Sequence, residues 1–208
     1  SRLSTFVESQ ADKSTGVRLR EAFEELGPTF VKLGQLLSTR PDVIPESVVQ
    51  DLTRLQDKVT PLPFESVKVV IERELGKPVL EAFATFEQSH LAAASIGQVH
   101  LATLNSGERV VVKVQRPEIQ EVIETDISLL AFMAGLLEKY VPESRVFRPR
   151  VMVDEFSKSL VYELDYVVEA NNMARVSANL ASIPDIVIPK VYKSHSTTRV
   201  LTQERLEG

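Results

Sequence analysis

Hydrophobic positions in residues 1–82 recur at the three- and four-residue spacing of amphipathic helices, and no alternating strand pattern interrupts them. Gly27 is a favourable C-terminal cap for the first helix, and Pro28 fits the first turn of the second. Gly76 and Pro78 end the last one. The predicted helices cover residues 17–26, 28–37, 45–55 and 63–75. We therefore expect a helical extension over residues 1–82.

From Phe83 onward the hydrophobic period changes to two, and the runs become short and rich in β-branched residues. The predicted strands cover residues 83–87, 98–104, 109–114, 186–192 and 198–204. Residues 105–108, Asn-Ser-Gly-Glu, have the chemistry of a hairpin turn between two of these strands. Pro189 interrupts another strand, which we therefore expect near a sheet edge.

Two long helical patterns lie between the third and fourth predicted strands, at residues 118–140 and 150–181. The second contains no glycine or proline and predicts one long helix or two helices joined at a kink. Its expected buried stripe consists of Phe156, Leu160, Leu164, Val167 and Val168. Long helices packed on a small antiparallel sheet give residues 83–208 an α+β fold.

The composition excludes several classes of function. The chain has no cysteine, which removes disulfides, iron–sulfur clusters and thiol catalysis. A net charge of −5 with interleaved signs offers no basic field for nucleic acid and no polybasic run for anionic lipid. No segment approaches the roughly 20 apolar residues of a membrane-spanning helix. Since residue 1 is serine and no leader pattern follows, we expect a processed or shortened chain.

The three histidines, His90, His100 and His195, stand apart from one another along the chain. This spacing is typical of core or surface side chains and differs from the clustering of metal ligands. We therefore predict no metal site within these residues.

A candidate phosphate-binding loop precedes the second predicted strand. Protein kinases lay a G-x-G-x-x-G-x-V loop over the nucleotide phosphates and follow it with a strand ending in V-A-I-K. Here Ala-Ala-Ala-Ser-Ile-Gly-Gln-Val occupies that frame, and Val-Val-Val-Lys supplies the lysine. The candidate nucleotide-binding residues are Ala92, Ala93, Ala94, Ser95, Ile96, Gly97, Val99 and Lys113. Singly, the alanines are more typical of a tight turn and the lysine of a solvated strand edge, but their order across one hairpin favours nucleotide binding.

An ammonium group held in a partly dry cleft needs a counter-charge, and the long helical pattern offers three acids. Asp165 and Glu169 are spaced i, i+4 and share a face of an ideal helix, whereas Glu163 and Asp165 point in different directions. Taken alone, such acids are equally typical of a solvated helix face.

A third motif lies in the helical extension. Gly34 stands in the middle of a predicted helix, where glycine costs about 1 kcal/mol relative to alanine, so we expect a close-packing contact there. Lys32 and Gln35 are i, i+3 neighbours and present two polar groups together. By spacing alone, this pattern is also consistent with ordinary helix packing and a lysine whose stem lies on apolar surface.

Together these motifs resemble those that define the UbiB family of atypical kinases, in the family's order and from about residue 26 to residue 208. The motifs are Lys32-x-Gly34-Gln35, the alanine loop ending in Ser-Ile-Gly-Gln-Val, Val-Val-Lys113-Val-Gln-Arg-Pro, and Glu163-x-Asp165 followed by Glu169-Ala-Asn-Asn. The resemblance implies a kinase-like N-lobe after a helical extension, binding of ATP or ADP with Mg²⁺, and support of isoprenoid quinone and related prenyl-lipid metabolism at membranes.

The resemblance also implies roles for single residues. The implied catalytic residues are Lys32, Gln35, Lys113, Glu163, Asp165 and Glu169. Lys113 would meet the nucleotide phosphates and pair with Glu169, whereas Lys32 would lie with Glu163 and Asp165. The helix that carries Lys32 would then cover the protein-substrate cleft and block protein phosphorylation. Since alanine does not reach positive φ as freely as glycine, the alanine loop would restrict closure over the γ-phosphate.

Residues 202–208 resemble the hinge strand that hydrogen-bonds adenine through its backbone, with Glu204 as the candidate contact. The patterns H-R-D-x-x-x-x-N and D-F-G, which carry the base and a magnesium ligand of ordinary kinases, do not occur in this sequence. We therefore expect half of an active site, with weak nucleotide affinity and no robust turnover.

Two functions of different classes stay open. One is the nucleotide-binding lobe of an ATP-dependent kinase or ATPase, peripheral to a membrane in the cytoplasm or an organelle. The other is an interaction module for a prenyl-lipid biosynthesis protein or a membrane surface, with a vestigial nucleotide site. Three separately placed charges, Lys32, Lys113 and Glu169, favour the first. An unrelated α+β domain would leave four ordered motifs unexplained.

Overall fold

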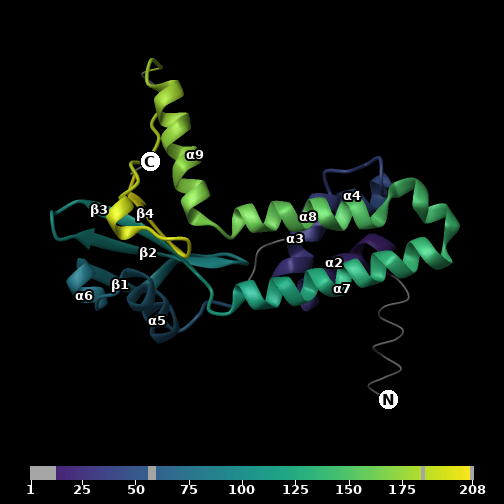
Figure 1. The fold of residues 1–208 in the computed structure, drawn as a ribbon, viewed down its shortest axis with the longest axis horizontal. Coiled ribbons are helices and arrows are strands. Elements are labelled where there is room, and N and C mark those ends of the chain that lie inside the picture. The colour runs from purple at the N-terminus through teal and green to yellow at the C-terminus, as the bar shows by residue number, and fades with distance from the viewer. Residues whose placement is uncertain (1–12, 56–59, 184–185, 207–208) are drawn as a thin grey trace. The chain divides into compact units, whose positions relative to one another are not determined.

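The computed structural model describes residues 13–55, 60–183 and 186–206 (Figure 1). The chain divides into two compact units, each formed by two stretches of sequence. The first unit contains residues 1–58 and 123–153, and the second contains residues 59–122 and 154–208. Helices α7 (Ile119–Tyr140) and α8 (Pro149–Glu163) each contribute residues to both units.

The first unit is helical, as its hydrophobic period predicts. Helix α2 (Thr15–Leu26) packs against α3 (Pro28–Leu37) and α4 (Glu46–Leu52), and the 3₁₀ helix η1 (Pro142–Phe147) follows α7. Gly27, at φ 105°, ends α2 and begins α3, a backbone geometry that favours glycine. Thr29 is fully buried and its hydroxyl donates to Asp126 of α7 over 2.5 Å. All four helices predicted for the extension are present. The first three are α2, α3 and α4 of this unit, and the fourth is α5 (Phe64–Leu75), which belongs to the second unit.

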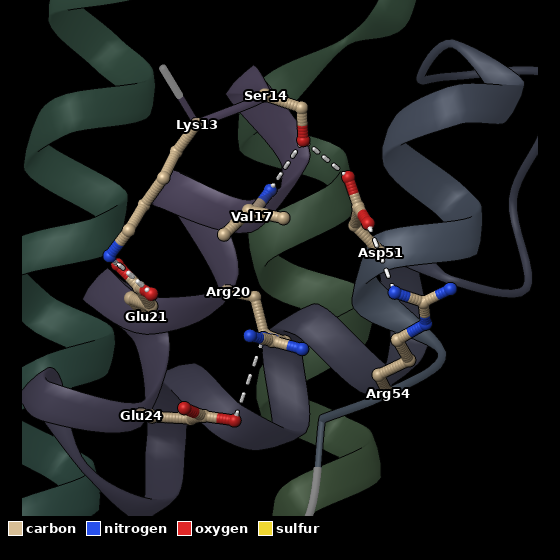
Figure 2. A network of polar contacts seen from close by, with 8 residues as sticks. All are labelled: Lys13, Ser14, Val17, Arg20, Glu21, Glu24, Asp51 and Arg54. Atoms are coloured by element: carbon tan, nitrogen blue, oxygen red, sulfur yellow. Dashed lines mark hydrogen bonds and ion pairs between the residues drawn. The ribbon is translucent and has the colours of Figure 1, made fainter. Parts of the chain in front are cut away.

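A polar network fixes the beginning of α2 to α4 (Figure 2). The Ser14 hydroxyl accepts from the backbone N–H of Val17 at 3.1 Å and donates to Asp51 at 2.6 Å. Ser14 is therefore both the N-cap of α2 and its polar link to α4. A Cβ at Gly16 would lie 2.5 Å from Asp51 Oδ2, so the close approach of the two helices requires glycine there.

The second unit is built on a four-stranded antiparallel sheet of order β1-β2-β3-β4 (Figure 1). The strands are β1 (Phe83–Ala93), β2 (Gly97–Leu104), β3 (Arg109–Gln115) and β4 (Val200–Glu204). The β2–β3 turn contains Gly107 at φ 99°, and its hairpin chemistry is as predicted.

The two faces of this sheet have different covers. On one face, α5 and α6 (Val79–Ala82) bury apolar side chains of β3, among them Val110, Val112 and Val114. On the other face, Leu201 of β4 packs with Tyr166 and Ala170 of α9 (Tyr166–Leu180). Because strand side chains alternate, Lys113 and Gln115 lie on this second face.

Two expectations for the C-terminal part need correction, the buried stripe of residues 150–181 and the strand at residues 186–192. The pattern at residues 150–181 forms two helices, α8 and α9, which is the second of the two predicted alternatives, and the break at Leu164 and Asp165 shifts the phase of the buried stripe. Val167 was expected to be buried but is 41% exposed, and Tyr166 is buried in its place. The strand expected at 186–192 is wrong apart from a single bridge between Val191 and Gln203, since Pro189 cannot donate to a ladder.

His100 is a core side chain, as its isolation in the sequence predicts. It is fully buried, and its Nδ1 lies 2.9 Å from the carbonyl oxygen of Glu87. Burial lowers the pKa of its imidazole. His195 is half-buried and His90 is exposed. Within the described ranges, no helix is long and apolar enough to cross a membrane.

Candidate functional site

The centre of the candidate site is an ion pair between β3 and α9. Lys113 Nζ lies 2.8 Å from Glu169 Oε2 and 3.2 Å from Oε1, so the predicted pairing of these residues is present. The lysine side chain is 30% exposed and the glutamate side chain 38%, which leaves both accessible to a ligand. A charged pair at such exposure contributes little to folding stability, so its geometry depends on what holds α9 against the sheet.

Tyr166 is a second partner of Lys113 that the sequence interpretation missed. Lys113 Nζ lies 4.6 Å from the centroid of the Tyr166 ring, within the range of a cation–π contact. Tyr166 is fully buried, and burial, with the nearby charges of Glu169 and Glu163, raises the pKa of its phenol. The sequence offered one signal for this role, an aromatic residue directly after the helix break. The assumption of a continuous helical period placed the buried stripe at Val167 and Val168 and so concealed that signal.

Gly97 allows the phenol to approach the sheet. A Cβ at Gly97 would lie 2.6 Å from Tyr166 Oη and 2.8 Å from the carbonyl oxygen of Val114. The backbone of Gly97 does not require a positive φ, so glycine is needed for space. Gly97 is the glycine that the loop motif retains, and its lack of a side chain leaves room for the Tyr166 hydroxyl.

The alanine loop is shorter in the structure than in the motif. Ala92 and Ala93 are the last residues of β1 and pair with Val99 and Gln98 of β2. The backbone N–H of Ala94 donates to the carbonyl of Gly97 at 2.8 Å and closes the hairpin.

Ser95 and Ile96 form the buried turn of this hairpin. Among the described residues, the Ser95 hydroxyl has no hydrogen-bond partner. Val99 lies directly opposite Lys113 in the β2–β3 register, so its side chain and the lysine share one face of the sheet.

Arg116, the residue directly after β3, is hydrogen-bonded to the alanine loop. Its backbone N–H donates to the carbonyl of Ile96 at 3.0 Å, and its guanidinium donates to the carbonyls of Ala94 at 3.3 Å and Thr60 at 2.9 Å. Burial lowers the pKa of Arg116. The loop is therefore held to the same strand that carries Lys113.

Gln115 makes a corresponding link to the helices. Its side-chain amide donates to the carbonyl of Leu164, at the break between α8 and α9, and to the carbonyl of Thr198 at 3.3 Å. The backbone N–H of Tyr166 also donates to Thr198, at 3.0 Å. Only 3% of Gln115 is exposed.

The remaining acids of the motif are divided by the helix break. Asp165 is the N-cap of α9 and accepts from the backbone N–H of Val167 at 2.9 Å. Its predicted face-sharing with Glu169 is wrong, because Asp165 has extended backbone angles and lies outside the helix. Glu163, the last residue of α8, instead lines a cleft of about 790 Å³ together with Glu169 and Met173.

Lys32 and Gln35 lie on α3 of the first unit, where both are half-buried. A Cβ at Gly34 would collide with Leu55 Cδ1 and lie 2.6 Å from Phe23 Cδ2, so the predicted close packing at this glycine is confirmed. The pairing of Lys32 with the acids of the second unit stays a prediction.

Glu204 is the last residue of β4. Its backbone N–H donates to the carbonyl of Lys190 at 2.8 Å, and its carboxylate accepts from the backbone N–H of Lys190 at 3.2 Å. Residues 207 and 208 of the expected hinge segment lie outside the described residues. The adenine contact of Glu204 therefore stays a prediction.

Comparisons with known proteins identify the family of this chain. Residues 54–208 match the family model of the ABC1 atypical kinase-like domain. Proteins named "Probable protein kinase UbiB" from Marinobacter nauticus and Xanthomonas oryzae pv. oryzae are 45% and 47% identical to this chain over 199 and 203 residues. These matches cover 96% and 95% of the chain but only 36% of each relative, so the chain spans about a third of their length.

A solved structure is also similar along the whole chain. It is described as the complex of Rv3197 with erythromycin from Mycobacterium tuberculosis, with a TM-score of 0.65 and 31% identity. The match covers 100% of this chain and 52% of that one. The family model, this structural match and the four-stranded sheet together confirm the expected α+β, kinase-like fold. The chain therefore belongs to the ABC1 family of atypical kinase-like proteins, and the relatives that match almost its whole length are named UbiB.

Proposed function

We propose that this chain is the nucleotide-binding lobe of a UbiB-type kinase or ATPase, which binds ATP or ADP with Mg²⁺ at Lys113. The observation that carries the proposal is the contact of 2.8 Å between Lys113 and Glu169, on the sheet face shared with Val99. In kinases, this pair directs an ammonium group toward the α- and β-phosphates.

The surroundings of Lys113 support this role physically. A compact ammonium group binds phosphate well when its position is fixed beforehand, since little conformational freedom is then lost on binding. Here the Glu169 carboxylate and the Tyr166 ring restrict the lysine from two sides. The guanidinium of Arg116 also holds the alanine loop to the end of the strand that carries Lys113, through its hydrogen bond to the Ala94 carbonyl.

The wider role is proposed from the resemblance of the four motifs to the UbiB family, whose name the relatives also carry. We propose that the full-length protein supports the biosynthesis or maintenance of isoprenoid quinones, as a protein peripheral to a membrane and in contact with prenyl-lipid biosynthesis proteins. Lys32 and Gln35 would act with Glu163 and Asp165 to limit access to the cleft. The alanine loop, from Ala92 to Gly97, would restrict closure over the γ-phosphate.

A thermal-shift titration with MgADP and MgATP tests the nucleotide site, because a ligand that binds only the folded state raises the melting temperature. We expect a saturable shift in the unaltered chain and in Lys68→Ala, which changes a partly exposed lysine of α5. We expect the shift to disappear in Lys113→Ala. Equal shifts in all three proteins would refute binding at Lys113. No shift in any of them up to millimolar nucleotide would favour the interaction module.

A further inference from the structure

We propose that Gln115 is a positioning residue that holds the beginning of α9 against β3 and thereby keeps Glu169 within reach of Lys113. The part of the proposal that concerns nucleotide affinity rests on the function proposed above. The part that concerns the position of α9 does not depend on it.

The argument begins with the weakness of the ion pair. Lys113 and Glu169 are each about one third exposed, and pairs at such exposure typically contribute less than about 1 kcal/mol. Solvent can replace either partner, so this pair alone does not fix the helix that carries Glu169. A second, buried attachment is needed to define the position of α9.

Gln115 provides that attachment. It lies two residues after Lys113 on the same face of β3, and its amide donates to Leu164 and Thr198. Breaking these contacts would leave the side-chain amide of Gln115, a buried donor, unsatisfied, which costs more than a typical hydrogen bond contributes. The resulting constraint acts at Leu164, two residues before α9 begins.

The position of Glu169 follows from this constraint. Tyr166 is the first residue of α9, and its backbone N–H donates to the same Thr198 carbonyl that Gln115 contacts. Glu169 is three residues further, on the next turn of the helix. A displacement of the N-terminal end of α9 would therefore move the Tyr166 ring and the Glu169 carboxylate away from Lys113 together.

The chain offers a matched control for this glutamine. Gln98 is a second buried glutamine of the sheet, 1% exposed, whose amide exchanges hydrogen bonds with the backbone of Leu62. It pairs with Val114 in the β2–β3 register and thus faces away from α9. Gln98→Leu and Gln115→Leu therefore remove the same group from opposite faces of one sheet.

The experiment measures the position of α9 directly. Since the chain has no cysteine, spin labels can be attached at Ser106→Cys, in the β2–β3 turn, and at Ser177→Cys on α9, both of which are exposed. We expect one narrow distance distribution by pulsed electron spin resonance for the unaltered chain and for Gln98→Leu. For Gln115→Leu we expect a broader distribution or a second, longer distance.

Calorimetric titration with MgADP provides the second readout. We expect the dissociation constant to rise about tenfold in Gln115→Leu, the loss that corresponds to one hydrogen bond, and to change less than threefold in Gln98→Leu. Gln115→Asn keeps an amide but is one methylene shorter, and serves for both readouts if the leucine variant does not fold.

The outcomes separate the two proposals. An unchanged distance distribution in the Gln115 variant would overturn the positioning role, even if its stability falls as much as that of Gln98→Leu. If the unaltered chain binds no MgADP, the proposed function fails, and the distance measurement still decides the role of Gln115.

Discussion

The substitution Gly97→Ala tests how closely Tyr166 and the sheet are packed beneath the alanine loop. The added Cβ would lie 2.6 Å from Tyr166 Oη and 2.8 Å from the Val114 carbonyl oxygen, both shorter than an ordinary van der Waals contact. Overpacking of this kind costs about 1–3 kcal/mol. The reduced entropy of the unfolded chain returns about 0.4–1 kcal/mol, because Gly97 has backbone angles that alanine can adopt. We expect a net loss of about 1–2 kcal/mol in the free energy of unfolding.

A double-mutant cycle with Tyr166→Phe assigns the cause of this loss. Within the described part of the chain, the Tyr166 hydroxyl has no hydrogen-bond partner, so its removal should leave stability unchanged or raise it by about 1 kcal/mol. Removal also frees space for the alanine, and we expect Gly97→Ala to cost at least about 0.5 kcal/mol less in the Tyr166→Phe background. Urea denaturation followed by circular dichroism measures all four proteins. A stabilising Gly97→Ala, or a cost that is identical in both backgrounds, would refute the packing.

Two further predictions concern other parts of the chain. Gly34→Ala should lower the stability of the first unit by about 1–3 kcal/mol, because its Cβ meets Leu55 and Phe23, and Leu55→Val should relieve part of the loss in urea denaturation. An additive double variant would contradict the assigned contact. Burial lowers the pKa of His100 below its ordinary value of 6.5, so between the two values the unfolded chain binds more protons than the folded chain. Stability should therefore fall as the pH decreases below about 6.5, by up to about 1.4 kcal/mol per pH unit, in the unaltered chain and in His90→Gln. His100→Phe should flatten this slope, and an equal slope in all three proteins would disprove the role of His100.

The sequence predicted most of the helices and strands because their signals are local. Gly27 and Pro28 define the boundary of α2 and α3 through backbone geometry alone. The break between α8 and α9 was not located, since no glycine or proline marks Leu164 and Asp165. Asp165 caps α9 locally at this break, and the Leu164 carbonyl accepts a tertiary hydrogen bond from the amide of Gln115, which lies 49 positions earlier in the chain. Helical periodicity does not contain such information.

The candidate site was predictable to the same extent. Lys113 and Glu169 could be paired because both belong to ordered motifs, and the ion pair is present in the structure. Tyr166 and Gln115 were missed because their roles depend on the break and on the sheet register. The expected partnership of Asp165 with Glu169 was wrong for the same reason, as an N-cap residue does not follow the helix period.

Protection of lysines from acetylation, read by peptide mass spectrometry, tests the central claim most directly, because it reports where on the chain a nucleotide binds. Saturating MgADP should slow the modification of Lys113 severalfold and leave Lys68 and Lys139 unchanged, since these two lie on α5 and α7. Equal modification of Lys113 with and without MgADP, at concentrations that raise the melting temperature, would contradict a nucleotide site at Lys113.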